Sequence, residues 1–157
     1  MLELLSQARS ITPATLIFER PADTVIGVDL GFKTVATLSD GRKLDMPQVA
    51  IALYLARSYS LICTESLDVA NNAFTLFFET LGRYCAREGS RHIAVGKYYP
   101  STRICSHCLL EGPRIKTSIR EWQCKACNAL HDRDFNAAKN ILREGRRLFR
   151  RAPLCYN

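Results

Sequence analysis

Four cysteines in two closely spaced pairs are the residues of this chain best suited to hold a metal ion. Cys105 and Cys108 form one Cys-x-x-Cys pair, and Cys124 and Cys127 form a second pair after 15 intervening residues. Each pair can present two thiolates from a tight turn, and four thiolates make a closed tetrahedral Zn²⁺ site. Because such a site leaves no position for a substrate, we expect one structural zinc ion in a zinc ribbon insert spanning 101–128.

The remaining cysteines and two nearby histidines lack this spacing. Cys63 lies in an apolar run and Cys85 in a helical pattern, and we predict that these two and Cys155 are buried, unreactive thiols. His107 and His131 lie close to the cysteine pairs in the sequence. Either histidine could replace a cysteine ligand or donate to a phosphate, but we interpret both as solvated.

Three carboxylates from distant segments form the second candidate site. Asp29 ends one apolar run, Glu65 lies near the end of another, and Asp134 opens a basic helical segment. Carboxylate oxygens are the ligands that Mg²⁺ and Mn²⁺ prefer, and two such ions can activate a water and stabilise the leaving oxygen in phosphodiester cleavage. Taken singly, the three acids also fit a turn residue, a surface acid and a helix N-cap, in that order.

Hydrophobic periodicity and turn signals predict the elements that would position these side chains. We expect strands at 24–30, 33–39 and 42–46, a helix at 48–59 with Pro47 in its first turn, a strand at 60–67, a helix at 71–88 closed by Gly89, a strand at 91–97 and a helix at 133–151. Asp40-Gly41 is a hairpin turn signal between the second and third strands.

This order of elements predicts an α/β fold of the ribonuclease H type. Its mixed sheet has three antiparallel strands first, followed by alternating helices and strands, with the zinc ribbon inserted before the last helix. We assign 24–100 and 129–151 to this domain, 1–23 to an N-terminal extension and 152–157 to a C-terminal tail.

The charge distribution indicates a nucleic-acid partner. The formal net charge is +7, and from Arg83 onward 16 Lys and Arg face only 6 Asp and Glu. The candidate nucleic-acid contacts are Arg103, Arg114, Lys116, Arg120, Trp122, Arg133, Lys139, Arg143, Arg146 and Arg147. The alternatives are that Trp122 only covers the zinc core and that the basic helix, which continues to Arg150 and Arg151, is a solvated face.

Two signals of membrane targeting are missing from the sequence. It contains no uncharged apolar window of 18 residues, and its N-terminus has no basic region of the signal-peptide kind. We therefore expect a cytoplasmic, nucleic-acid-associated protein with no membrane partner.

Several stretches resemble a known family. IGVDLGFKTVATLSDG, LICTESL, YYPSTRICSHC and CKACNALHDRDFNAAKNIL resemble, in order, the sequence blocks of transposon-encoded TnpB proteins, to which the miniature type V CRISPR effector nucleases are similar. The resemblance covers about residues 24–145. It implies a RuvC-type, RNase H-like nuclease that cuts DNA under an RNA guide, with a zinc ribbon before the final RuvC motif.

The resemblance also implies roles for individual residues. Asp29, Glu65 and Asp134 match the three RuvC acids, and Asp132 would be a neighbour of the third acid rather than a ligand. The four cysteines match the family's ribbon. Leu109 replaces a glycine that often follows the second ribbon cysteine.

Two segments are shorter than in the family. Only about 23 residues precede the first motif, where the family has a large region that grips guide RNA and target, and 35 residues separate Asp29 from Glu65. We therefore expect a stand-alone endonuclease with two Mg²⁺ or Mn²⁺ ions acting most readily on DNA, or one targeted by a partner protein, rather than self-contained RNA guidance.

Other functions remain open. The first alternative is a non-cleaving nucleic-acid-binding protein or transposon-derived remnant that keeps the fold, and RNA is a possible substrate or partner. An actin-like ATPase would need a second lobe and a second phosphate loop, for which this chain has no room.

Overall fold

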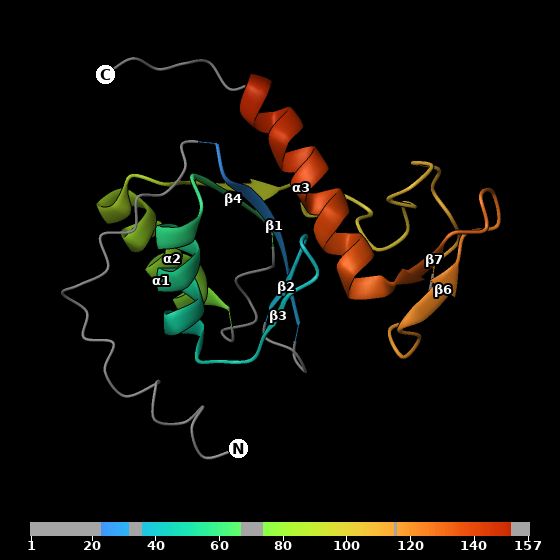
Figure 1. The fold of residues 1–157 in the computed structure, drawn as a ribbon, viewed down its shortest axis with the longest axis horizontal. Coiled ribbons are helices and arrows are strands. Elements are labelled where there is room, and N and C mark those ends of the chain that lie inside the picture. The colour runs from blue at the N-terminus through green and yellow to red at the C-terminus, as the bar shows by residue number, and fades with distance from the viewer. Residues whose placement is uncertain (1–22, 32–35, 67–73, 115, 152–157) are drawn as a thin grey trace, which may run out of the picture.

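The structure, a computed structural model, describes residues 23–31, 36–66, 74–114 and 116–151 (Figure 1). Its elements are β1 (Val25–Leu30), β2 (Ala36–Leu38), β3 (Lys43–Leu44), α1 (Gln48–Ser58), β4 (Leu61–Glu65), α2 (Thr75–Glu88), β5 (Arg91–Val95), β6 (Glu121–Gln123), β7 (Leu130–Asp132) and α3 (Arg133–Arg151). The predicted order of strands and helices is confirmed.

The predicted element boundaries needed small corrections. The third strand covers Lys43–Leu44 rather than 42–46, because only these two residues pair with β2. The predicted positions 33–35, 67 and 71–73 lie outside the described residues. The prediction that Pro47 lies in the first turn of α1 is wrong by one residue, since the helix begins at Gln48 and Pro47 precedes it with a ψ of 138°.

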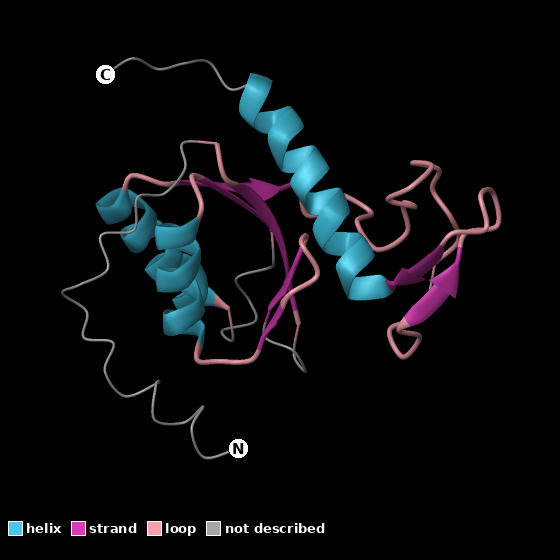
Figure 2. Cartoon of the chain, viewed as in Figure 1, coloured by secondary structure: helices cyan, strands magenta, loops and turns pink. Residues whose placement is uncertain are grey.

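Five strands form one mixed sheet in the order β3-β2-β1-β4-β5. β2 runs antiparallel to β1 and β3, whereas β4 runs parallel to β1 and β5. Helices α1 and α2 cover one face of this sheet, and α3 crosses the other face (Figure 2). The predicted mixed α/β sheet is therefore confirmed.

The side chains of β1 alternate between the two layers. Ile26, Val28 and Leu30 belong to the core beneath α1 and α2, whereas Val25 packs in the smaller core beneath α3. Successive side chains of a strand point to opposite faces of its sheet. Asp29 is therefore on the face that α3 covers. The apolar core residues of the same strand, Ile26, Val28 and Leu30, point to the opposite face.

Two glycines let α3 lie directly on the central strands. A Cβ atom at Gly27 would come within 2.2 Å of the carbonyl oxygen of Ala138, and one at Gly145 would come within 2.3 Å of the Cys63 sulfur. Any larger side chain would push the helix away from β1 and β4. The first turn of α3 consequently lies near the carboxyl ends of these strands, where Asp29 and Glu65 are found.

Several local predictions are confirmed. Gly89 ends α2 with a φ of 68°, the left-handed conformation that suits a helix C-terminus. Cys63 and Cys85 are buried, and burial raises the pKa of the Cys63 thiol to about 12, which keeps it protonated. Cys155 lies outside the described residues. Within the described parts of the chain, no helix is long and apolar enough to cross a membrane.

Candidate metal centre and active site

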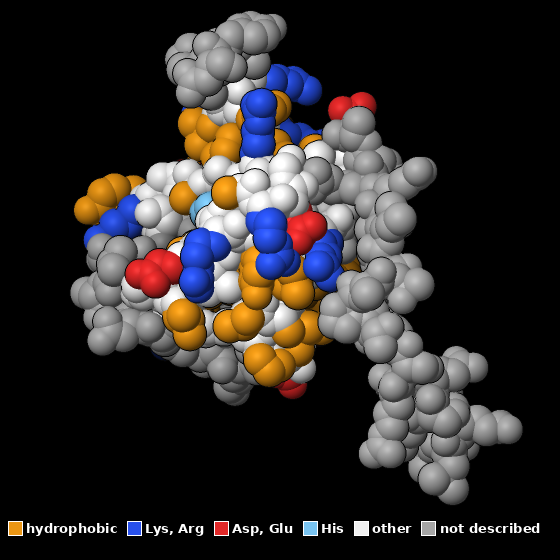
Figure 3. Space-filling view, turned by 90° about the vertical axis from the view of Figure 1, so that its left-hand side faces the viewer, with side chains coloured by type: hydrophobic (Ala, Val, Ile, Leu, Met, Phe, Trp, Pro, Cys, Tyr) orange, Lys and Arg blue, Asp and Glu red, His pale blue; other side chains and the backbone are white. Residues whose placement is uncertain are grey.

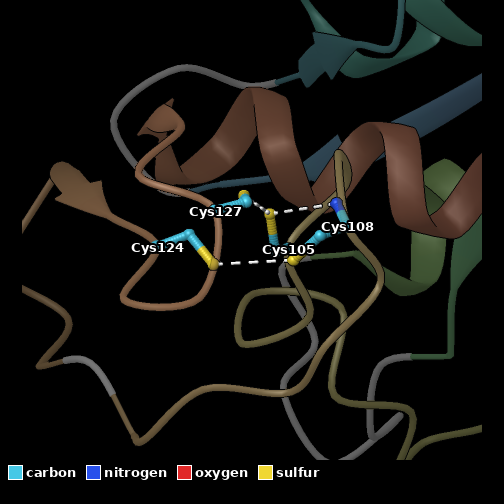
Figure 4. A group of neighbouring side chains, drawn as sticks. All are labelled: Cys105, Cys108, Cys124 and Cys127. Carbon is cyan, nitrogen blue, oxygen red and sulfur yellow. Dashed lines mark hydrogen bonds between the residues drawn. The ribbon is translucent and has the colours of Figure 1, made fainter.

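The four predicted cysteines form a single cluster beside the first turns of α3. Their sulfur atoms point toward one another from two loops and all lie within 4.8 Å of one another (Figure 4). The sulfurs of Cys105 and Cys127 are 3.6 Å apart, and those of Cys108 and Cys124 are 3.7 Å apart. Four sulfurs at tetrahedral Zn–S distances of about 2.3 Å would be separated by about 3.8 Å. The residues therefore fit one zinc ion.

The two cysteine loops have the same backbone design. In the first loop the N–H of Leu109 donates to the carbonyl of Cys105, and in the second the N–H of Asn128 donates to the carbonyl of Cys124. The residue after each second cysteine adopts a positive φ, 69° at Leu109 and 59° at Asn128. Asparagine visits this left-handed conformation readily, whereas leucine does so at a cost. Leu109, which stands where the family often has a glycine, is therefore in a strained backbone conformation.

Backbone N–H groups lower the pKa of one cysteine thiol in the second loop. The N–H groups of Cys127 and Ala126 donate to the Cys124 sulfur and lower its thiol pKa to about 7. A thiolate is the form that binds zinc. This loop therefore presents one ligand close to its ionised form at neutral pH.

The interpretation of His131 as a solvated residue is wrong. Its Nε2 lies 3.0 Å from the Cys105 sulfur, and its ring packs against Trp122 with the ring centroids 4.6 Å apart. Burial, with the nearby charges of Lys139 and His107, lowers the pKa of His131. Trp122 covers the cysteine cluster through this contact, while it also lines an open groove of about 700 Å³ beside Ile119. Its two predicted roles, cover and contact surface, are compatible.

The structure brings the three predicted acids to one place. Residues 25–28 of β1 pair in parallel with 61–64 of β4, and the same register continued by one residue sets Glu65 beside Asp29. The N–H of Leu30 donates to the Glu65 carboxylate, so this side chain reaches the end of β1. Asp134, in the first turn of α3, is close enough to both acids to act on their charge.

We call the place where Asp29, Glu65 and Asp134 meet the acidic pocket. Burial and mutual repulsion make it unfavourable for all three side chains to be ionised there. Asp29 is 9% exposed, and burial, followed by the charges of Glu65 and Asp134, raises its pKa to about 8. Burial also raises the pKa of Glu65, and Asp134 adds to the shift against the opposing effect of the Leu30 N–H and Arg133. A bound cation would reverse both shifts.

Asp132, rather than Asp134, caps α3. The N–H of Phe135 donates to Asp132 Oδ1 at 2.9 Å, and the Lys43 ammonium lies 2.9 Å from Asp132 Oδ2. Although burial opposes the shift, these hydrogen bonds lower the pKa of Asp132. The alternative reading of Asp134 as the helix N-cap is therefore wrong, which leaves its carboxylate available to the acidic pocket.

Two arginines of the inserted segment and of α3 supply positive charge to the pocket. Arg120 Nη1 donates to Asp134 Oδ2 at 2.6 Å, and Arg133 donates through Nη1 to the carbonyl of Thr117 at 2.7 Å. Both guanidinium groups act on the charge of Asp29. The ligand atoms of the four cysteines all lie within 4.8 Å of one another. Among the described residues, the three acids do not form so close a group.

Two buried asparagines that the sequence prediction missed join the ribbon to α3. Asn136 accepts the N–H of Ser106 at 2.8 Å and donates to the carbonyl of Ile104 at 2.8 Å. Asn140 donates to the carbonyl of Ser101 at 2.8 Å and also to that of Ile104. Their spacing of four residues on an otherwise apolar helix face is the signal that could have identified them.

The predicted nucleic-acid contacts differ in how far they are already engaged. Intramolecular partners hold Arg103 (Glu111), Arg120 (Asp134), Arg133 (Thr117), Lys139 (the Phe135 ring), Arg143 (Tyr99) and Arg147 (Glu144). Arg114, Lys116 and Arg146 are exposed and form no ion pair within the described parts of the chain. Their binding to nucleic acid remains a prediction.

Comparisons with known proteins agree on one relationship. A family model described as Cas12f1-like, TNB domain, matches residues 74–141. A protein of Streptomyces pristinaespiralis, whose name proposes an RNA-guided DNA endonuclease, is 35% identical over 77 residues, which are 49% of this chain and 19% of that protein. The chain therefore matches about a fifth of the length of this relative.

A solved structure shares the fold. It is the cryo-EM structure of a Cas12f1–sgRNA–target DNA complex, with a TM-score of 0.56 and 11% sequence identity over 78% of this chain and 50% of that chain. At this identity the match supports the arrangement of helices and strands.

Proposed function

We propose that this chain, which is similar to TnpB proteins and miniature type V CRISPR effectors, is a metal-dependent endonuclease of the RuvC type. Its substrate is DNA, and its catalytic acids are Asp29, Glu65 and Asp134. The observation that carries this proposal is the convergence of these acids at the carboxyl ends of β1 and β4, beneath the first turn of α3. A buried acidic cluster of this kind is costly to the fold unless a cation neutralises it.

The donor set of the pocket fits hard divalent cations. Three carboxylates suit Mg²⁺ or Mn²⁺, which prefer oxygen ligands and keep part of their hydration shell for the substrate. When bound, such ions activate a water and stabilise the leaving oxygen of a phosphodiester. The raised pKa of Asp29 is consistent with this fit, because it reflects unbalanced negative charge in a desolvated place.

The surrounding residues orient the acids and supply positive charge. The N–H of Leu30 fixes the Glu65 carboxylate, and the cap made by Asp132 fixes the turn that carries Asp134. Arg120 neutralises Asp134 and comes from the ribbon, so it can turn to a substrate phosphate once a cation occupies the pocket. The ribbon would hold one structural zinc ion and position this arginine.

The name of the relative also supports RNA as a partner. We propose that guide RNA, or a partner protein, selects the DNA site, while the acidic pocket performs the cleavage.

Two observations favour the alternative of a non-cleaving nucleic-acid-binding protein. Arg120 occupies the Asp134 carboxylate, and among the described residues the acids are spaced more widely than the cysteines. A protein that keeps the fold without cleaving would tolerate this arrangement.

Cleavage assays separate the two functions. Zinc-loaded protein, assayed with and without its co-purifying RNA, would be incubated with labelled single-stranded, duplex and branched DNA and with RNA, in Mg²⁺ or Mn²⁺. We expect DNA cleavage that depends on the added cation and falls at least about 100-fold in Asp134→Asn. Asp45→Asn removes the same charge from an exposed loop and should cleave normally. DNA binding without cation-dependent cleavage would support the alternative.

A further inference from the structure

We propose that a cleft at the C-terminal half of α3, remote from the acids, binds the phosphate backbone of the same nucleic acid. The cleft has a volume of about 700 Å³ and lies between α3 and the ends of β1, β4 and β5 at which these strands begin. Three arginines line it, Arg91 at the start of β5 and Arg146 and Arg150 on α3. The identity of the ligand rests on the proposed function, but the cleft itself does not.

The arginines converge from separate parts of the chain. Arg146 and Arg150 are one helical turn apart, and they continue a ridge that begins with Lys139 and Arg143, since at 100° per residue these four side chains fall within about 60° of one another. Arg91 joins them from the sheet, 55 positions earlier in the sequence. A solvated helix face would not require a contribution from β5.

Among the described residues, these arginines have no carboxylate partner of the kind that other basic residues have. Arg147 pairs with Glu144, and on the side formed by α1 and α2 basic side chains lie beside acidic ones, as Arg57 and Arg87 do beside Glu88 (Figure 3). By contrast, no ion pair within 4.0 Å involves the three cleft arginines in the described ranges.

The chemistry of the lining suits a phosphate. Among the described residues that line the cleft, Asp23 is the one acidic residue, so their positive charge exceeds their negative charge. The guanidinium group of Arg91 lies over the ring of Phe149, 5.3 Å from its centroid. This contact holds the planar donor group in place, and a preorganised guanidinium loses less entropy when it binds an anion.

A ligand that contacts both the cleft and the acids must be extended. Arg150 follows Asp134 by 16 positions on α3, which corresponds to about 24 Å along the helix axis. That length equals about 7 base pairs of duplex. A small anion could fill the cleft alone, but only a phosphate polymer could contact the cleft and the acidic pocket together, and such a polymer is the substrate of the proposed reaction.

Salt-dependent binding tests the proposal. We would measure the affinity of the full chain for a duplex of about 20 base pairs by fluorescence anisotropy, between about 50 and 300 mM salt, without added Mg²⁺ or chelator. In Arg146→Gln/Arg150→Gln, the slope of log K against log salt should become less negative by about 2, and affinity should fall about 10-fold or more at the lowest salt. Arg91→Gln should change the slope by about 1.

Matched variants separate charge from folding. Arg83→Gln/Arg87→Gln removes the same charge from α2 and should leave the salt slope unchanged. Arg146→Lys/Arg150→Lys retains the charge of the cleft and should keep most of the wild-type slope. Zinc content and thermal melting would establish that each variant is folded. Equal slopes for wild type and the two glutamine variants of the cleft would overturn the proposal, and would leave an acidic protein segment as the candidate ligand.

The failure of this inference is distinguishable from failure of the proposed function. Cation-dependent cleavage with equal salt slopes for wild type and the cleft variants would overturn only the proposed phosphate-binding cleft. Altered slopes without cleavage would overturn only the proposed nuclease function.

Discussion

The two candidate metal sites of this protein are assembled in opposite ways. The four cysteines lie between positions 105 and 127, and two short turns bring their sulfurs within 4.8 Å of one another. The three acids come from β1, β4 and α3, and only the complete sheet with its covering helix brings them together. The cysteine cluster is therefore a local structure, and the acidic pocket is a property of the whole fold.

The sites also differ in how the protein treats their charge. Backbone N–H groups lower the pKa of the Cys124 thiol to about 7, whereas burial and neighbouring anions raise that of Asp29 to about 8. Backbone N–H groups thus favour the ionised form of Cys124, whereas, against the effect of a backbone N–H, burial and neighbouring cysteines raise the thiol pKa of Cys108 and Cys127. The acids are held close together against their repulsion by packing elsewhere in the fold, which is typical of a functional site.

The largest effect is expected when the cysteine cluster is disrupted. In Cys105→Ser/Cys124→Ser, zinc content should fall from about one ion per chain to below about 0.1, since structural zinc binding supplies folding energy to its ribbon. Emission spectrometry would measure the zinc, and limited proteolysis should show new cleavage within 101–132. Because Asn136 and Arg120 join the ribbon to α3 and to Asp134, cleavage activity should be lost as well.

The controls test whether cleavage depends on the cysteine cluster while zinc binding does not depend on the acids. Cys85→Ser, a substitution at a buried cysteine outside the cluster, should retain its zinc. Asp134→Asn should also retain zinc while losing cleavage. Loss of zinc in Asp134→Asn would contradict the view that the cysteine cluster is local.

The acidic pocket should show itself in the pH dependence of stability. The folded-state pKa of Asp29, about 8, exceeds its usual value of 3.8. Its stabilising contribution is therefore complete below pH 4 and is lost as the pH rises toward 8. Without added Mg²⁺, the free energy of unfolding should fall through this range by up to about 1.4 kcal/mol per pH unit, and Glu65 acts in the same direction.

Urea unfolding at several pH values would measure this effect. Asp29→Asn should flatten the curve between pH 5 and about 8, and the affinity of the wild type for Mg²⁺ should increase over the same range because the ion competes with a proton. Asp45→Asn serves as the control. Parallel pH curves for wild type and Asp29→Asn would mean that the acids are not coupled as the structure indicates.

The smallest expected effect compares the two cysteine loops with each other. Leu109→Gly should raise the free energy of unfolding by about 0.5–1 kcal/mol, because glycine adopts a φ of 69° without the strain that leucine bears. Asn128→Gly should change it by only a few tenths, since asparagine already tolerates this conformation. Thermal melting of the two variants would measure the difference, and equal shifts would indicate that Leu109 is not strained.

Much of the architecture could be predicted from the sequence, because it depends on short-range patterns. A run of apolar residues predicted β1, Gly89 predicted the end of α2, and the spacing of the cysteines predicted their cluster. The predictions for Pro47 and the third strand erred by one or two residues, as element ends depend on individual hydrogen bonds.

The errors and omissions concern contacts across the fold. His131 lies close to the cysteine pairs in the sequence but was interpreted as solvated, and its contact with the Cys105 sulfur became clear only in the fold. The spacing of Asn136 and Asn140 did not indicate that their partners would be backbone carbonyls more than 30 positions away. Arg91 was not predicted as a nucleic-acid contact, because only the tertiary structure places it beside Arg146 and Arg150.

The sequence by itself determined the cysteine cluster and the order of elements, and it identified three candidate acids, since these depend on residue type and spacing. Only the tertiary structure decided that Asp29, Glu65 and Asp134 meet, that Asp132 caps the helix, and that the cleft arginines form no ion pair with another described residue. The physical reason is that burial, repulsion and pairing depend on distances between segments, and those distances exist only once α3 packs on Gly27 and Gly145.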